Sequence, residues 1–123
     1  MKPAKFIIAI LVLTIFLLTI SHFTGNPSMA DEKETVVQVT AKKFEYSPKE
    51  IRLKKGVPVV LEFTSLDRLH GFNCPSLNIR SDIFPGKKNV LRFTPDRAGS
   101  FPFHCDNFCG SGHEGMTGTI IVH

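Results

Sequence analysis

The stretch CDNFCGSGHEGM, residues 105–116, places two thiols, an imidazole and a thioether within one short segment. Its spacing, C-x3-C-x3-H-x2-M, singles out Cys105, Cys109, His113 and Met116. Cysteine, histidine and methionine are ligands that suit copper, whereas carboxylate-rich sites suit harder ions. The glycines after Cys109, with no β-branched residue before Met116, are typical of a loop that folds back around an ion. The stretch therefore predicts a copper-binding loop.

The segment after this loop, TGTIIVH at residues 117–123, has the composition of a closing strand. Residues 100–103, in front of the loop, also predict a strand. A loop held between two strands presents its ligands to one point, because the strands form a rigid scaffold.

Apolar and polar residues alternate along the chain from Thr35 onward. The apolar positions are Val37 and Val39, Phe44 and Tyr46, Ile51 and Leu53, and Val59, Leu61 and Phe63. A period of two predicts half-buried strands, and the turns between them are predicted at Ser47-Pro48 and Lys55-Gly56. Residues 90–93 predict one more strand, and no segment after residue 30 has a helical period. Short strands punctuated by glycine and proline predict an all-β sandwich.

Two other uses of the cysteines stay open from the residues alone. Cys105 and Cys109 are four positions apart, so in an exported protein they are candidates for a small disulfide. A Cys/Cys/His set also suits zinc, although zinc sites rarely include a thioether. The chain has three cysteines, and an odd number cannot all pair internally.

A copper site needs a second imidazole, and His70 is the best candidate. His22 lies in the N-terminal apolar segment and His123 is the last residue. His104 directly precedes Cys105, so in a strand its side chain points to the opposite face. His70 follows a polar loop and begins a predicted short strand. From its position alone it could also be a core residue, because a lone histidine beside apolar residues usually is.

Cys74 shares strand parity with His70 and Phe72, so all three side chains are expected to point inward. A free cysteine there is best interpreted as a small core residue. Its nearness to the expected site leaves extra ligation or disulfide exchange as the alternative.

The N-terminal segment predicts an exported protein. Lys2 and Lys5 precede an apolar run from Phe6 to Ile20, and the small residues around Met29 form a cleavage site ending at Ala30. These features predict one hydrophobic helix within a cleaved signal peptide. The alternative is an uncleaved membrane anchor over residues 6–23, which reaches the lower end of a spanning length.

The chain is therefore divided into a signal peptide or anchor at 1–30, a charged linker at 31–34 and one domain at 35–123. In either case the domain lies outside the cytoplasm, in the periplasm or an equivalent space. The 15 Lys and Arg against 11 Asp and Glu include two lysines of the leader, so the domain carries about +2. This charge is too small to argue for nucleic acid or an anionic membrane.

By its loop at residues 105–116, followed by Gly118 and an apolar strand, the chain resembles a known family. This is the family of binuclear copper (CuA) domains in cytochrome c oxidase subunit II and nitrous-oxide reductase. The segment Leu69-His70-Gly71-Phe72 is similar to the one that carries the family's first histidine ligand. Residues 36–63 resemble the front half of such a domain. The resemblance implies a cupredoxin-like Greek-key β-sandwich or barrel.

The resemblance also implies a ligand set for two copper ions. Both would be bridged by the sulfurs of Cys105 and Cys109. One ion would add His70 and a weak axial Met116, and the other would add His113 and the backbone carbonyl of Asn107. Backbone N–H groups of residues 110–112 are expected to steady the sulfurs.

A site with every position filled by protein implies electron transfer rather than catalysis, since a catalytic metal needs an open position. The expected partner is a c-type cytochrome or a terminal oxidase or reductase. The docking hairpin and the large catalytic domain of the family members are missing from this sequence, which favours a stand-alone carrier or a minimal subunit. The alternatives are a mononuclear blue or red copper carrier and a periplasmic copper delivery or buffering protein.

Overall fold

The computed structural model describes residues 33–123 of the chain. Strands and two short 3-10 helices follow one another in this part. Their bounds are β1 (Thr35–Lys42), β2 (Glu45–Ser47), β3 (Glu50–Leu53), β4 (Val59–Ser65), β5 (His70–Cys74), η2 (Pro75–Leu77), β6 (Ile79–Ile83), β7 (Asn89–Phe93), β8 (Gly99–His104), η3 (His113–Gly115) and β9 (Thr117–Val122).

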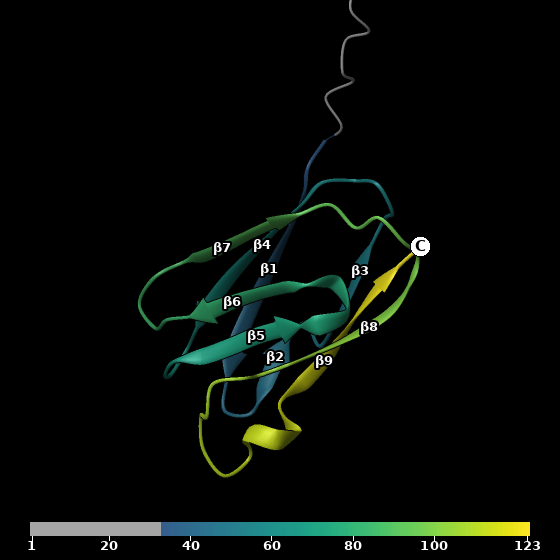
Figure 1. The fold of residues 1–123 in the computed structure, drawn as a ribbon. Helices are drawn as coiled ribbons and strands as arrows, with labels where there is room; N and C mark the ends of the chain where they lie inside the picture. Colours follow the sequence, from purple (N-terminus) through teal and green to yellow (C-terminus); the bar gives the residue numbers. More distant parts are fainter. Residues whose placement is uncertain (1–32) are drawn as a thin grey trace, which may run out of the picture. The chain divides into compact units, whose positions relative to one another are not determined.

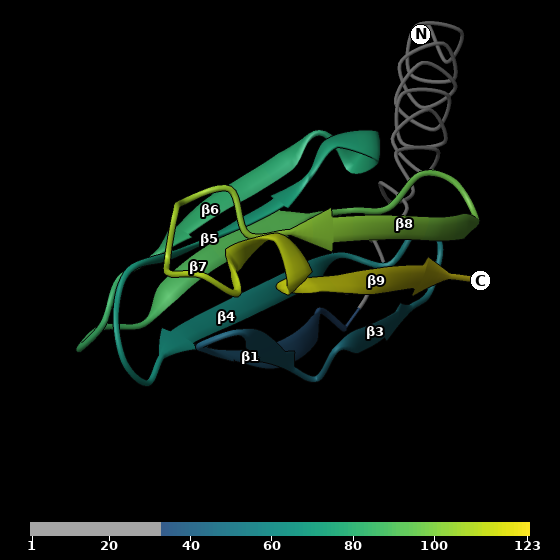
Figure 2. The same cartoon turned by 90° about the horizontal axis from the view of Figure 1, so that it is seen from below.

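The strands form two sheets that face each other (Figures 1 and 2). One sheet has the order β2-β1-β4-β7 and the other has the order β3-β9-β8-β5-β6. The prediction of an all-β sandwich is confirmed. The expected N-terminal helix, whether signal peptide or anchor, lies outside the described residues. Residues 33–123 contain no helix long and apolar enough to span a membrane.

The two sheets combine parallel and antiparallel pairs. β1 runs parallel to β4, with Val39 opposite Phe63, and β3 runs parallel to β9. β8 and β9 are antiparallel and are joined by residues 105–116, so the predicted metal loop connects two neighbouring strands. Figure 1 shows this loop in yellow-green at the lower end of the domain.

Aromatic side chains fill the space between the sheets. Phe63, Phe72 and Phe103 are the largest fully buried side chains, and the ring centroid of Phe72 lies 4.8 Å from that of Phe63 and 4.7 Å from that of Phe103. Burying each ring contributes about 1.5–3 kcal/mol. Tyr46 packs edge-on against Phe103 at 5.0 Å, and its hydroxyl donates to the carbonyl oxygen of Gly71 at 2.6 Å. The aromatic core is therefore joined directly to the first residues of β5 by the Tyr46 hydroxyl.

Two parts of the fold depart from the sequence predictions. Phe44 lies in the turn between β1 and β2 rather than in a strand beside Tyr46. The strand β6 was not predicted, because its inward positions include Ser81 and its sequence, IRSDI, shows no clear alternation. β6 is the edge strand of its sheet, where a fully apolar face is not required.

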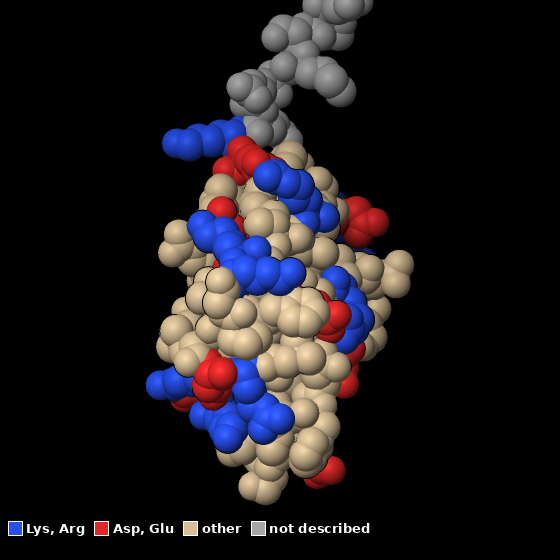
Figure 3. Space-filling model, turned by 90° about the vertical axis from the view of Figure 1, so that its left-hand side faces the viewer, with Lys and Arg blue, Asp and Glu red and all other residues tan. Residues whose placement is uncertain are grey.

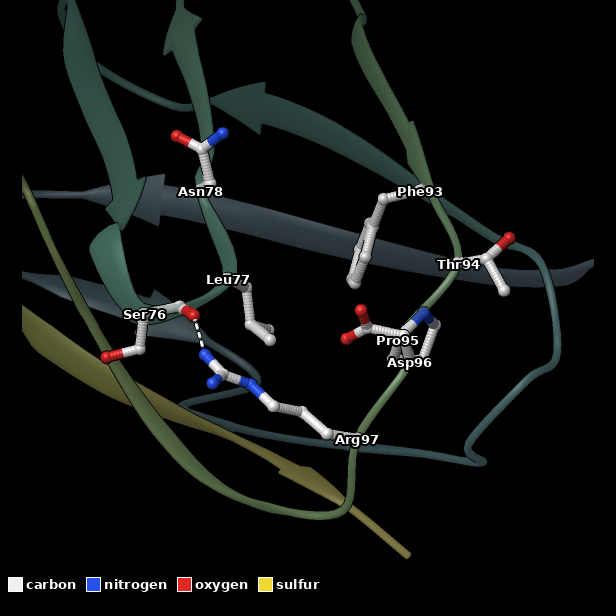
Figure 4. Close-up of a pocket in the computed structure, with 8 residues that line it drawn as sticks. All are labelled: Ser76, Leu77, Asn78, Phe93, Thr94, Pro95, Asp96 and Arg97. Atoms are coloured by element: carbon white, nitrogen blue, oxygen red, sulfur yellow. Dashed lines mark hydrogen bonds between the residues drawn. The ribbon is translucent and has the colours of Figure 1, made fainter.

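A hollow of about 260 Å³ lies where β5 and β7 end, lined by residues 76–78 and 93–97 (Figure 4). Arg97 reaches across it and donates a hydrogen bond to the carbonyl oxygen of Ser76. His70 begins β5, so this hollow lies at the other end of the strand from the predicted metal loop.

Candidate metal centre

Two buried thiols form the centre of the site. The sulfur atoms of Cys105 and Cys109 lie 3.7 Å apart, which is far beyond the 2.05 Å of a disulfide bond. The backbone N–H of Cys105 donates to the carbonyl oxygen of Met116 at 3.1 Å and closes the base of the loop. Both cysteines are therefore free thiols held side by side in the interior.

His70 reaches the thiols from a different strand. As the first residue of β5 it points inward and is completely buried, as the strand parity predicted. One ring nitrogen of His70 and the sulfurs of Cys105 and Cys109 all lie within 4.8 Å of one another. Its Nδ1 atom is buried and has no hydrogen-bond partner within residues 33–123. A buried nitrogen without a partner is costly unless a ligand or an ion uses it.

Asp67 determines which nitrogen of His70 is free. Its Oδ1 atom lies 2.6 Å from Nε2 of His70. Burial raises the pKa of Asp67, but hydrogen bonds from the N–H of Lys43, from His70 and from the N–H of Arg68 outweigh this and lower it to about 2. The carboxylate is therefore ionised and only accepts, so it favours the proton on Nε2, and in a neutral imidazole the lone pair then lies on Nδ1. This was not predicted from the sequence.

The remaining predicted donors surround the thiols. Sγ of Cys109 lies 3.5 Å from Nδ1 of His113 and 3.8 Å from Sδ of Met116, which is fully buried. Sγ of Cys105 lies 3.1 Å from the backbone oxygen of Asn107. The structure thus brings together all six residues that the sequence singled out. Their role as ligands stays a prediction.

Two other polar candidates lie outside this group. Cys74 is fully buried in the hydrophobic core, where its thiol contacts the carbonyl oxygen of Phe101 at 3.9 Å. Its interpretation as a core residue is confirmed. His104 is exposed on the opposite face of β8, as its parity with Cys105 predicted.

An ion-pair network that the sequence did not reveal anchors the loop to β6. Nε of Arg80 lies 2.5 Å from Oδ2 of Asp106, and Nη2 of Arg80 lies 2.8 Å from Oδ1 of Asp82. The same Asp82 oxygen accepts a hydrogen bond from the Asn107 side chain at 2.9 Å. Hydrogen bonds from Arg80 and then from Asn107 lower the pKa of Asp82. The network fixes the side chains of Asp106 and Asn107, and the backbone carbonyl of Asn107 is one of the predicted donors.

Two glycines of the site lie where neighbouring groups approach too closely for a side chain. A Cβ atom on Gly71 would meet Oδ1 of Asp106 at 2.0 Å and the backbone nitrogens of Asp106 and Asn107 at 3.1 Å, so glycine lets the loop lie against β5. A Cβ atom on Gly112 would meet the Phe44 ring at 2.3 Å, so Phe44 lies directly over the loop. The backbone N–H that reaches a site sulfur within the described residues is that of Gly71, 3.4 Å from Cys105, rather than one of residues 110–112 as expected.

The surroundings keep the metal-free thiol of Cys109 protonated. Burial raises the pKa of Cys109 to about 11, and the hydrogen bond and charge of Cys105 add to the rise. A metal that binds Cys109 must therefore displace this proton, and its affinity increases with pH. The donor set of two thiols, two imidazoles, a thioether and a carbonyl fits copper and is too rich in soft ligands for magnesium or calcium.

Comparison with known proteins identifies the class. Residues 7–122 match the family described as the Cupredoxin-like domain, and the chain belongs to this family. Within it, cytochrome c oxidase subunit 2 of Thermus thermophilus is a relative that is 36% identical over 102 residues, covering 76% of this chain and 76% of that protein.

Two further similarities agree with this relationship. The nitrous-oxide reductase of Ralstonia nicotianae is 34% identical over 94 residues, covering 73% of this chain but 15% of that much longer protein. The crystal structure of the periplasmic domain of subunit II of cytochrome oxidase from Bradyrhizobium japonicum superposes with a TM-score of 0.67 at 20% identity, covering 72% of this chain and 83% of that one. At this identity the structural match shows the fold alone.

Proposed function

We propose that this chain is an exported copper protein that transfers single electrons through a binuclear, CuA-type centre. One observation carries the proposal: two free thiols 3.7 Å apart lie beside a buried histidine, His70, whose Nδ1 atom has no hydrogen-bond partner within residues 33–123. The relationship to cytochrome c oxidase subunit 2 and nitrous-oxide reductase supports the same conclusion.

The proposed ligands are the six residues that the sequence singled out. Cys105 and Cys109 would hold both ions, together with His70 and Met116 for one of them and His113 and the carbonyl of Asn107 for the other. A copper pair held by these residues would supply one-electron chemistry.

The protein supplies a rigid and closed surrounding for this chemistry. Met116, Cys109 and His70 are fully buried, so water is excluded from one side of the site. Asp67 orients His70, and Arg80 ties the loop to β6. Residues whose positions are fixed before and after a change in charge keep the reorganisation barrier low. Every proposed position is filled by protein, so we propose no catalytic role.

We propose that the domain works in the periplasm or an equivalent space, delivered by the signal peptide or held by an anchor at residues 6–23. The relatives include cytochrome c oxidase subunits and nitrous-oxide reductases, which supports a redox partner such as a c-type cytochrome or a terminal oxidase or reductase. The mild charge of the chain gives no support to a nucleic-acid partner.

Copper content and electron paramagnetic resonance test the proposal. The fully loaded protein is expected to hold two copper ions per chain and to show hyperfine coupling to two equivalent nuclei. A single-copper spectrum at full loading would favour a mononuclear carrier built on Cys109, His113, Met116 and His70.

A second measurement separates a carrier from a copper donor. The loaded protein is mixed with a metal-free copper acceptor and, separately, with a reduced c-type cytochrome. Retained copper with rapid reduction supports the carrier, whereas rapid copper loss without electron uptake supports delivery or buffering.

A further inference from the structure

One buried side chain of the aromatic core carries a polar group. Tyr46 is the single tyrosine of a chain that has 11 phenylalanines. It belongs to β2, and only 3% of its surface is exposed. Phenylalanine would fill nearly the same volume without a hydroxyl to desolvate, and a buried hydroxyl is costly unless it has a partner. The partner of this hydroxyl therefore shows what tyrosine does here that phenylalanine could not do.

The Tyr46 hydroxyl reaches from one sheet to the other. β2 belongs to the sheet β2-β1-β4-β7, whereas β5 belongs to the facing sheet. The hydroxyl donates to the carbonyl oxygen of Gly71 on β5 at 2.6 Å, in the interior of the domain. Burial, and then the neighbouring Cys105, raise the pKa of Tyr46, so the hydroxyl keeps the proton that it donates.

Gly71 directs its other polar group to a proposed copper ligand. Its backbone N–H donates to Sγ of Cys105 at 3.4 Å. β5 pairs with β8 at Asn73 and His104, two residues further along β5, so Gly71 lies beyond this pair. A thiol and a hydroxyl, rather than β8, therefore bond the N–H and the carbonyl oxygen of Gly71.

Gly71 has no side chain by which the core could hold it. A Cβ atom there would meet Oδ1 of Asp106 at 2.0 Å, so the position has to stay bare. Glycine also has the greatest conformational freedom of all residues. Gly71 lies opposite Asp82 of β6 on one side of the strand. On the other side, the direction of its N–H depends on the hydrogen bonds from Tyr46 and to Cys105.

The ring of Tyr46 is itself held in place by the core. It packs edge-on against Phe103 and Phe72, with ring centroids 5.0 Å and 6.2 Å away. Phe72 follows Gly71 in β5, and Phe103 lies two residues before Cys105, at the end of β8. The hydroxyl is therefore fixed relative to both strands that lead into the metal site.

We propose that Tyr46 is a positioning residue of the copper centre: it holds Gly71 so that the Gly71 N–H donates to Sγ of Cys105, and this raises the reduction potential. The inference rests on the proposed copper function. A hydrogen bond to a cysteine sulfur withdraws electron density from the sulfur and favours the reduced state of the metal. Tyr46 acts through Gly71 rather than as a ligand.

The first test needs no metal. Amide hydrogen exchange of the metal-free full chain is followed residue by residue by nuclear magnetic resonance. The Gly71 N–H is expected to be protected in the parent and to exchange about tenfold faster in Tyr46→Phe, which removes only the hydroxyl. Cys105→Ala should release the same N–H from the other side, because it removes the acceptor.

Ile51→Val is the matched control for this test. It removes one methyl group from the same core, on β3, and has no polar group that could bond Gly71. It lowers the stability of the whole domain, as loss of a buried hydroxyl contact also does. The exchange rate of Gly71, compared with that of other core amides, should therefore stay as in the parent.

The second test measures the copper-loaded chain. At equal copper content, Tyr46→Phe is expected to have a lower reduction potential than the parent and a shifted sulfur-to-copper charge-transfer absorption. Ile51→Val should keep the parent values. Figure 3 shows Lys and Arg interspersed with Asp and Glu on one face of the domain. Tyr46→Phe changes none of these charges, so a change in potential cannot come from them.

The variants decide between positioning and simple packing. Unchanged exchange at Gly71 in Tyr46→Phe would overturn the positioning role. Faster exchange with an unchanged potential would overturn the effect on the metal. Equal changes in Ile51→Val would attribute both effects to lost core stability and would overturn the inference as well.

Two further outcomes are covered. If Tyr46→Phe does not fold, the parent and Cys105→Ala decide: a Gly71 N–H that exchanges as fast as an unbonded amide, or that Cys105→Ala leaves unchanged, overturns the inference. A chain that binds no copper refutes the proposed function and with it the effect on the potential. Hydrogen exchange then still decides whether Tyr46 positions Gly71.

Discussion

The sulfur atoms of Cys105 and Cys109 lie 3.7 Å apart in the interior, too far for a disulfide bond and close enough to bind the same ion. Two sulfurs that share an ion at about 2.3 Å each are at most about 4.6 Å apart. The C-x3-C loop therefore holds two adjacent thiols, and the second thiol is what distinguishes a binuclear from a mononuclear site.

Cys105→Ser tests the need for the second thiol. The variant is expected to lose the spectrum of two equivalent copper nuclei and to keep at most one copper on Cys109, because a hydroxyl is a poor ligand for copper. Copper content and electron paramagnetic resonance measure this. An unchanged two-copper spectrum would contradict the bridging role of Cys105.

Met116→Leu tests the axial donor. Sδ of Met116 lies 3.8 Å from Sγ of Cys109, and leucine conserves the buried volume. The variant is expected to keep both copper ions and to have a higher reduction potential, because loss of a weak donor disfavours the oxidised state. Voltammetry measures the potential. Complete loss of copper would show that Met116 is needed to form the site.

Arg80→Ala tests the network that ties the loop to β6. Removing the guanidinium releases Asp106 and Asp82 together, so we expect copper to pass to a chelator about tenfold faster. Arg80→Lys, which keeps the charge, should reverse part of this increase in rate. Arg52→Ala removes another exposed arginine, paired with Glu50 at 2.6 Å on β3, and should leave the rate unchanged. Equal rates of copper transfer for all variants would show that the network does not stabilise the copper site.

Gly112→Ala tests the packing of Phe44 over the loop. The new Cβ would lie 2.3 Å from the ring, and we expect the free energy of unfolding to fall by about 1–3 kcal/mol. Adding Phe44→Ala should recover part of this loss, because the clash is removed. Gly115→Ala is the control, since nothing lies within 4 Å of its Cβ position. A cost at Gly115 as large as that at Gly112 would disprove the explanation. Chemical denaturation measures all three.

The buried thiol of Cys74 should make the free energy of unfolding depend on pH. Burial raises the pKa of its thiol above the ordinary 9.0. Above pH 9 the unfolded chain loses this proton first, so the free energy of unfolding falls as pH rises, by at most about 1.4 kcal/mol per pH unit for one group. Denaturation of the metal-free protein between pH 8 and 10 should therefore show a shallower fall in Cys74→Ala. Tyr46 and Cys109, whose pKa values are also raised by burial, act equally in both proteins. Identical slopes would contradict the prediction.

The local sequence was enough to predict most of the strands and the donor side chains of the metal loop. Alternation at Val37 and Val39, and at Val59, Leu61 and Phe63, depends only on which side chains must be buried, and β1 and β4 follow it. Parity along a strand likewise predicted that His70 and Cys74 face inward while His104 faces outward. These properties repeat every two residues, so neighbouring positions are enough to read them.

Only the tertiary structure decided which segments meet. β1 pairs in parallel with β4, His70 meets Cys105 from 35 positions upstream, and Arg80 on β6 pairs with Asp106, which follows β8, on the other side of β5. The orientation of His70 depends on Asp67, whose carboxylate also accepts the N–H of Lys43 from another turn. Such contacts depend on the order and register of distant strands, which hydrogen bonding between backbones and the shape of the shared core select. A local pattern of side chains contains no information about that selection.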